Sequence, residues 1–94
     1  MQVSHTHELE GGRSHYSIVR IKASSGWRVA NASAAEADRL AAVRALILEA
    51  QEYDADAIIG LDFEVDAIKR ADLDGAPLQR IAATGIAVKF AQAA

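Results

Sequence analysis

The chain has 94 residues, 13 acidic and 10 basic side chains, no cysteine and a formal net charge of −3. This length fits one small domain, expected over residues 1–94, and the acidic balance argues against a nucleic-acid-binding surface. The lack of cysteine excludes disulfides and thiolate metal sites. No apolar run approaches the ~20 residues that span a bilayer, and the N-terminus lacks a secretory-signal pattern, so we expect a soluble, cytoplasmic protein.

Alanine dominates the apolar composition. Hydrophobic residues make up 51% of the chain, and 21 residues are alanines, which bury little area. The hydrophobic core of so small a domain therefore has a thin margin over chain entropy. Small domains of this kind commonly gain stability from disulfides, a metal or a partner chain. Without cysteine, self-association is the leading expectation.

Two strands are expected before the first turn-rich segment. Residues 2–9 are predicted to form a short strand that ends at Gly11 and Gly12. The segment SHYSIVRIKA, residues 14–23, alternates with a period of two, which is typical of a strand. The small residues at 24–26 then end it.

Residues 33–54 are predicted to form a helix. Ser33 and Glu36 have the spacing of a capping box, and the many alanine, leucine and arginine residues favour helix. A broad stripe expected to face a sheet contains Leu40, Val43, Leu46, Ile47, Ala50 and Tyr53. A narrower stripe of Ala37, Ala41 and Leu48 has two interpretations, tolerated surface residues or a subunit contact.

The second half of the chain predicts two long strands. In ADAIIGLDFEVD, residues 55–66, one face is expected to carry Ile59, Leu61, Phe63 and Val65, and the other Gly60, Asp62, Glu64 and Asp66. A polar connection over residues 67–77 leads to a last strand at about 78–91. Gly85 in that strand indicates a bulge or the close approach of another backbone.

This order of elements predicts an α+β fold. We expect a small two-layer β-α-β-β unit in which an antiparallel three-stranded sheet, with a possible short N-terminal strand, carries one helix on one face. The last strand is expected between the other two. The second sheet face would be partly apolar and uncovered, so we expect a partner chain to cover it.

Two short motifs resemble those of a known family. ADAIIG at residues 55–60 and GIAV at residues 85–88 resemble the GADAVVG-like strand entry and GTAV-like last strand of the YbjQ family, labelled as "putative heavy-metal-binding". The opening VSHTHELEG also looks like that family's V-x-T-T strand. The resemblance implies a dodecin-subunit-like fold and assembly into rings, with YbjQ-like members similar to pentamers. The segment at residues 24–31 is shorter than the family's usual one.

His5 and His7 are candidate metal ligands. Alternate residues of a strand share a face and lie about 6.5–7 Å apart, a distance at which two imidazoles can chelate zinc, nickel or copper. A complete divalent-metal site would need His15 or residues of a neighbouring subunit. The alternative interpretation is exposed polar strand residues.

Three carboxylates form a second candidate site. Asp62, Glu64 and Asp66 would line one strand face and could bind a hard cation or a small ligand. The alternative is cross-strand ion pairing, for which the basic partners would be Arg20, Lys22, Arg80 and Lys89.

Trp27 is the only tryptophan of the chain. It loosely resembles the tryptophan that stacks on flavin in dodecins. The alternative roles are a lid over the helix start or an interface anchor.

No catalytic motif is present: the sequence has no cysteine nucleophile, no G-x-S-x-G and no phosphate-binding glycine loop. We therefore expect a non-enzymatic, self-assembling domain that binds a small ligand or metal at subunit interfaces. The alternatives are a metal-binding protein that uses its N-terminal histidines, and a dodecin-like flavin-binding protein.

Overall fold

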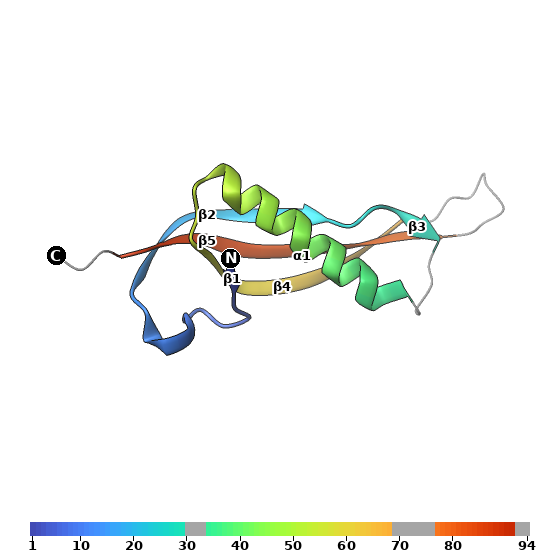
Figure 1. The fold of residues 1–94 in the computed structure, drawn as a ribbon. Coiled ribbons are helices and arrows are strands. Elements are labelled where there is room, and N and C mark those ends of the chain that lie inside the picture. The colour runs from blue at the N-terminus through green and yellow to red at the C-terminus, as the bar shows by residue number, and fades with distance from the viewer. Residues whose placement is uncertain (30–33, 69–76, 92–94) are drawn as a thin grey trace.

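One helix lies across one face of a sheet in the computed structural model, which describes residues 1–29, 34–68 and 77–91 (Figure 1). The helix α1 spans Ala35–Glu52. The strands are β1 at Gln2–Val3, β2 at His15–Ser24, β3 at Arg28–Val29, β4 at Ala57–Ile68 and β5 at Leu78–Phe90, and a short 3-10 turn, η1, covers Glu10–Gly12. The predicted α+β class is confirmed. No helix among the described residues is long and apolar enough to cross a membrane.

The sheet is built around β5. Its strand order is β1-β4-β5-β2, with β3 also paired to β5. Strand β5 runs antiparallel to β2, β3 and β4, whereas β1 is parallel to β4. The last strand therefore lies between the two earlier long strands, as the sequence predicted. The sheet is mixed because β1 is parallel to β4, and it also contains β3, a strand that the sequence did not predict.

A β-bulge at Gly60 shifts the alternation of β4 by one residue and so exchanges the faces to which its following side chains point. Ile59 pairs with Ile86 and Asp62 with Thr84, so Gly60 and Leu61 together stand opposite a single residue of β5. Gly60 has a φ of +63°, which glycine adopts without steric cost. Because the bulge adds one residue, Ile59 and Leu61 pack in different clusters on opposite faces. The prediction that these two side chains share a face was therefore wrong.

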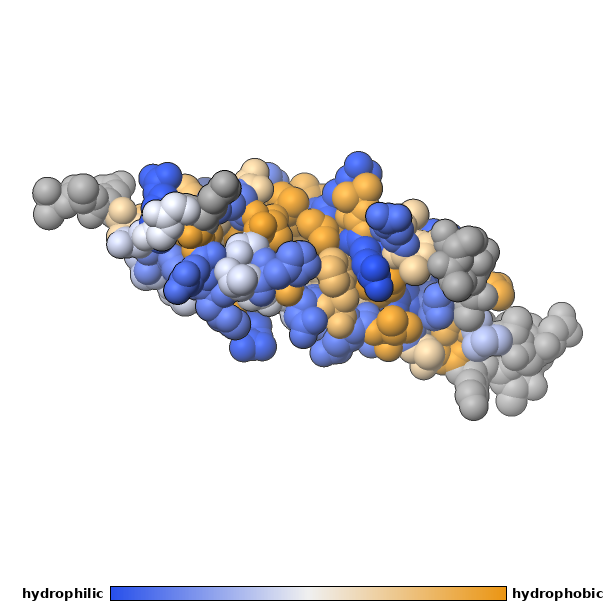
Figure 2. All heavy atoms as spheres, turned by 90° about the horizontal axis from the view of Figure 1, so that it is seen from below, coloured by the Kyte–Doolittle hydropathy of each residue, from blue (hydrophilic) through white to orange (hydrophobic). Residues whose placement is uncertain are grey.

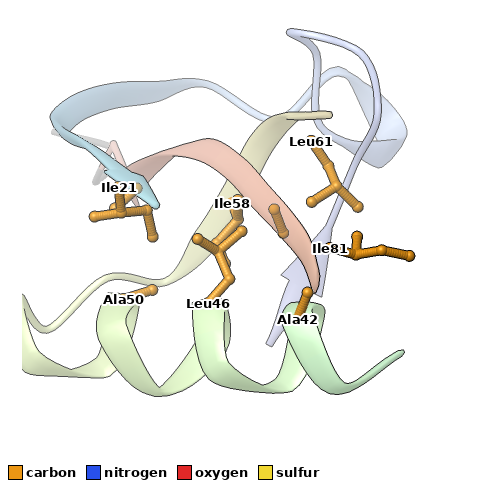
Figure 3. Packing of buried hydrophobic residues seen from close by; sticks show 9 residues of the cluster. Ile21, Ala42, Leu46, Ala50, Ile58, Leu61 and Ile81 are labelled. Carbon is orange, nitrogen blue, oxygen red and sulfur yellow. The ribbon is translucent and has the colours of Figure 1, made fainter. Parts of the chain in front are cut away.

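The helix packs on the sheet through small residues. Its buried positions are Asp38, Ala42, Leu46 and Ala50, spaced four residues apart, and Figure 3 shows the last three directed at the sheet. The predicted stripe was wrong in two of its six members, because Leu40 and Tyr53 are 50% and 44% exposed. Alanines allow the helix to approach the strands closely, so the larger side chains lie beside the contact. The other stripe, Ala37, Ala41 and Leu48, is exposed.

Gly85 lies under this contact. A Cβ atom at this position would lie 2.6 Å from Cγ2 of Ile58, 3.3 Å from the backbone oxygen of Ile59 and 3.6 Å from Cδ2 of Leu46. The predicted close approach of another backbone is confirmed, and the bulge itself lies on the facing strand.

The helix ends are asymmetric. Ser33 of the predicted capping box lies outside the described residues, and Ala34 at the N-cap makes no side-chain capping bond. At the other end the amide of Ala55 donates to Ala50 O at 3.2 Å. Asp54 adopts a left-handed φ of 57°, a conformation that aspartate tolerates better than most residues. The chain therefore turns from α1 into β4 within a few residues.

The N-terminal strand is shorter than predicted. It ends at Val3 rather than residue 9, because the Ser4 and Thr6 hydroxyls both donate to the backbone oxygen of Glu8 at 3.1 Å. Such local bonds favour turns over strands. The segment instead follows the edge of β4, where the Gly60 amide donates to Thr6 O at 2.8 Å.

Leu9 closes this segment onto the second sheet face. It is 3% exposed and forms a cluster with Ala57, Ile59 and Val88. The expectation that this face is uncovered therefore needs correction at one end, where the chain covers it with its own leucine. Beyond this cluster the same face carries the acidic residues Asp62, Glu64 and Asp66 of β4.

Candidate functional site

A polar pocket lies beside the β-bulge, on the sheet face opposite α1. It has a volume of about 210 Å³ and is lined by residues of the N-terminal segment, β2, β4 and β5: His7, Arg20, Gly60, Asp62, Thr84, Gly85 and Ile86. We refer to it as the polar pocket. It brings together two candidates from the sequence, His7 and Asp62, which the chain separates by more than fifty residues.

The bulge glycine makes room for the histidine. A Cβ atom on Gly60 would lie 2.9 Å from Nε2 of His7, a distance that side-chain carbons do not tolerate. The hydrogen bond from the Gly60 amide to Thr6 fixes the adjoining backbone. The imidazole therefore packs directly on the β4 backbone at the pocket wall.

Opposite charges flank the centre of the pocket. In the strand register, Asp62 of β4 pairs with Thr84 of β5, and Arg20 of β2 pairs with Ile86 of β5. Arg20 and Asp62 thus lie on the two strands that border β5, two strand spacings apart, or about 9.5 Å across the sheet. Neither forms an ion pair with another described residue. One Asp62 oxygen, Oδ1, accepts from the Phe63 amide at 2.9 Å.

The other two carboxylates of the acidic row are paired across strands. Glu64 lies 3.7 Å from Lys22, with both side chains more than half exposed. Asp66 accepts from Nε of Arg80 at 3.0 Å. Exposed pairs of this type contribute little stability. Glu64 and Asp66 are therefore paired with basic residues, and of the three carboxylates only Asp62 lines the polar pocket.

The three histidines do not lie together. Because the strand ends at Val3, the prediction that His5 and His7 share a strand face was wrong. The His5 ring lies 6.3 Å from the Phe63 ring. His15 Nδ1 lies 3.2 Å from the Arg13 oxygen, beside a separate hollow of about 370 Å³ lined by Glu8, Leu9, Gly12, Arg13, Ser14 and His15. Within residues 1–29, 34–68 and 77–91, no group of three or more His, Asp or Glu side chains could hold a metal ion.

Trp27 lies between β2 and β3. Its side chain is 41% exposed, and the Arg80 guanidinium lies 4.4 Å from its ring centroid. This cation–π contact occupies one face of the indole. The contact joins Trp27 to the Arg80–Asp66 pair, and a flavin-stacking role stays a prediction.

An apolar groove runs between the helix and the sheet edge. It has a volume of about 460 Å³ and is lined by Glu36, Ala37, Arg39, Leu40, Val43 and Phe63. We call it the α1–β4 groove. Figure 2, which looks from below the frame of Figure 1, shows hydrophobic surface exposed on this side of the molecule among hydrophilic side chains.

Sequence reasoning missed two polar-pocket residues. Arg20 had been assigned only as an ion-pair partner, and Thr84 had been given no role. The signal that could have found them is the pair of glycines, Gly60 and Gly85. Two glycines in facing strands indicate a bulge, and a bulge re-aims the side chains around it.

Comparisons with known proteins agree with this architecture. Residues 18–91 match the family model YbjQ_1, described as "Putative heavy-metal-binding". The chain is also similar to a crystal structure of a protein of unknown function of the DUF74 family from Pediococcus pentosaceus. The TM-score is 0.69 and the identity 11%, over 97% of this chain and 98% of that chain, so the likeness shows the fold alone. A search of curated proteins finds no match. The motifs at residues 55–60 and 85–88 lie within the matched range, whereas His5, His7 and His15 precede it.

Proposed function

Because this chain belongs to the YbjQ family, we propose that it is a non-enzymatic, self-assembling domain, a homo-oligomer that binds a small ligand. The family is described by metal binding and not by a catalysed reaction. A ring of five copies follows from the resemblance to pentameric YbjQ-like proteins.

The observation that carries the proposal is how much surface the single chain exposes. The accessible surface is 6168 Å² for a mass of 10.0 kDa, against about 5200 Å² expected for a compact monomer of this mass. The radius of gyration is 15.9 Å, against about 12 Å expected. The surplus of roughly 970 Å² is similar to one partner's share of a standard interface, about 800 Å².

Two strand edges offer a place for the partner. Among the described residues, no strand pairs with the outer edge of β2, or with β4 beyond its contact with the N-terminal segment. The β2 edge carries Arg20 and Lys22, whereas the β4 edge carries Asp62, Glu64 and Asp66. Unpaired edges favour association, and edges of opposite charge favour a head-to-tail contact. Head-to-tail contacts close into rings when the rotation permits.

The α1–β4 groove supports the same junction. Leu40 lines it and is 50% exposed, and Val65 on the neighbouring strand edge is 65% exposed. A copy added to the β4 edge would remove these side chains from water, which stabilises the contact by about 25 cal/mol per Å² of apolar surface. The same addition would leave the polar pocket at or near a subunit junction.

The mass of the untagged protein tests the proposal. Light scattering coupled to chromatography should give a pentamer of about 50 kDa, five times the 10.0 kDa chain. Glu64→Lys should weaken the assembly by reversing the charge of the β4 edge. Glu49→Lys, the same change on an exposed helix position, is the control and should leave the mass unchanged. A stable monomer at micromolar concentration would refute the proposal.

Metal binding is the second candidate. It is favoured by the meeting of His7 and Asp62 in the polar pocket, since an imidazole and a carboxylate are ligands for zinc, nickel and copper. Arg20 in the same pocket opposes it, because a fixed cation repels another. Calorimetry with each metal should show binding that His7→Ala removes. An absence of binding below about millimolar metal would exclude this candidate, since functional sites bind more tightly.

A further inference from the structure

We propose that the polar pocket binds a small zwitterion of the α-amino acid class, with its carboxylate at Arg20 and its ammonium group at Asp62. This inference rests on the proposed function only in that a small ligand is bound. It assigns the chemical class of that ligand from the pocket itself.

The charges of this sheet face show which groups remain for a ligand. Glu64 is engaged by Lys22 and Asp66 by Arg80. Arg20 and Asp62 form no ion pair with a described residue, and both line the polar pocket. The pocket therefore has one cationic and one anionic side chain, each able to take a partner of opposite charge.

The register sets the distance that a ligand would bridge. Arg20 pairs with Ile86, and Asp62 with Thr84, two residues away along β5. Two strand spacings and two residue rises separate the Arg20 and Asp62 Cα atoms by roughly 12 Å. Both residues line the polar pocket. An α-amino acid that makes one hydrogen bond with each of them needs roughly 8–9 Å between the guanidinium nitrogen and the carboxylate oxygen, which is shorter than the separation of the two Cα atoms.

The uncharged residues that line the polar pocket suit the remaining parts of an α-amino acid. Thr84 lies on β5, between the strands that carry the two charged residues, and its hydroxyl can donate to a carboxylate. Ile86 offers apolar contact to a short side chain, and Gly85 also lines the pocket. His7 forms the wall over Gly60. A volume of about 210 Å³ admits a molecule of glycine to serine size.

The two opposite charges of the pocket also select against simpler ions. Asp62 repels a free anion such as acetate or phosphate, and Arg20 repels a metal ion or an amine. Only a ligand with both charges satisfies both residues, and specificity of this kind arises from repulsion as much as from attraction. The pocket therefore favours a zwitterion over either half of it.

Calorimetry on the full-length protein tests this with glycine, L-serine, acetate, methylammonium and zinc as probes. Glycine or L-serine should bind at least tenfold more tightly than acetate or methylammonium. Arg20→Gln and Asp62→Asn should each weaken glycine binding at least tenfold, and Asp62→Asn should reduce the discrimination against acetate. Lys22→Gln and Glu64→Gln, which change the neighbouring pair outside the pocket, are the controls and should change binding less than threefold.

Equal affinity for acetate and glycine would overturn the inference, and so would glycine binding that survives both pocket substitutions. The absence of binding when glycine or L-serine is present at 50-fold excess over protein at millimolar concentration would also overturn it. Zinc binding without zwitterion binding would overturn it in favour of the metal candidate. The oligomer mass, measured on the same samples, separates this inference from the proposed assembly. A pentamer that does not bind glycine contradicts the proposed ligand class alone, whereas a monomer that binds glycine contradicts the proposed assembly alone.

Discussion

Nη2 of Arg28 lies 2.8 Å from Oδ1 of Asp38, an ion pair that joins β3 to the first turns of α1. Asp38 is 1% exposed, and its Oδ2 has no hydrogen-bond partner among the described residues. A buried carboxylate with one partner depends strongly on that partner. The pair therefore anchors the start of the helix to the short strand that the sequence did not reveal.

Removal of the arginine should test this dependence. We expect Arg28→Ala to lower the free energy of unfolding by about 2 kcal/mol, less than the roughly 3–5 kcal/mol of a fully buried pair, because the arginine side chain is 47% exposed. In an Asp38→Asn background the same substitution should cost less than half as much, since no buried charge is left behind. Urea unfolding of the unsubstituted protein, the two single variants and the double variant, all at the same protein concentration, measures this double-mutant cycle. Additive effects would contradict the coupling.

Gly85 should not accept a side chain. Gly85→Ala places a carbon 2.6 Å from Cγ2 of Ile58, and overpacking of this kind costs about 1–3 kcal/mol of unfolding free energy. Gly26→Ala is the matched control, because nothing lies within 4 Å of the added carbon there, and its effect should stay within about 0.5 kcal/mol. Thermal or urea unfolding compares the two. Equal effects would show that the contact between β5 and Ile58 is looser than the distances indicate.

The fold was largely predictable, and its exceptions have local causes. Alternation in residues 14–23 and 55–66 predicted two of the long strands, and the order of the elements along the chain predicted that the last strand lies between them. The helix contact was misjudged because sequence patterns weight large side chains, whereas Ala42 and Ala50 are the residues that let α1 approach the sheet. The opening strand was overextended because hydroxyl bonds from Ser4 and Thr6 turn the chain after Val3.

The candidate site was less predictable. His7 and Asp62 were both identified, but each was grouped with its sequence neighbours. Their meeting depends on a bulge that shifts β4 by one residue and on a bend of the N-terminal segment. Periodicity cannot locate an inserted residue, so the pocket partners Arg20 and Thr84 could not be assigned from the pattern alone.

The cost of alanine at the Gly60 bulge can be compared with the cost of alanine at Gly12. Gly60 and Gly12 have similar φ values of +63° and +66°, but only an added carbon at Gly60 meets a neighbour, the His7 ring. The backbone cost of alanine at such φ values is about 1–2 kcal/mol. Gly60→Ala should therefore destabilise the protein more than Gly12→Ala. In a His7→Ala background the two costs should become similar. Urea unfolding measures the difference, and an unchanged gap in that background would show that the His7 ring does not cause it.

Leu40 and Leu48 allow the proposed junction to be located on one helix. They are 50% and 64% exposed in the single chain, so alanine at either should change the stability of the isolated fold by less than about 0.5 kcal/mol. Leu40 lines the α1–β4 groove, whereas Leu48 belongs to the other stripe. If a neighbour covers the groove, Leu40→Ala should raise the concentration at which the oligomer dissociates about tenfold, which corresponds to about 1.4 kcal/mol.

Leu48→Ala, which makes the same change on the same helix, should leave that concentration unchanged. Native mass spectrometry over a dilution series measures both. A shift with Leu48→Ala instead would move the junction to the stripe of Ala37, Ala41 and Leu48. The polar pocket would then lie on the opposite side of the sheet from the contact, and ligand binding should be independent of dilution. Binding that weakens on dilution together with a Leu40→Ala effect would instead place the pocket at the junction.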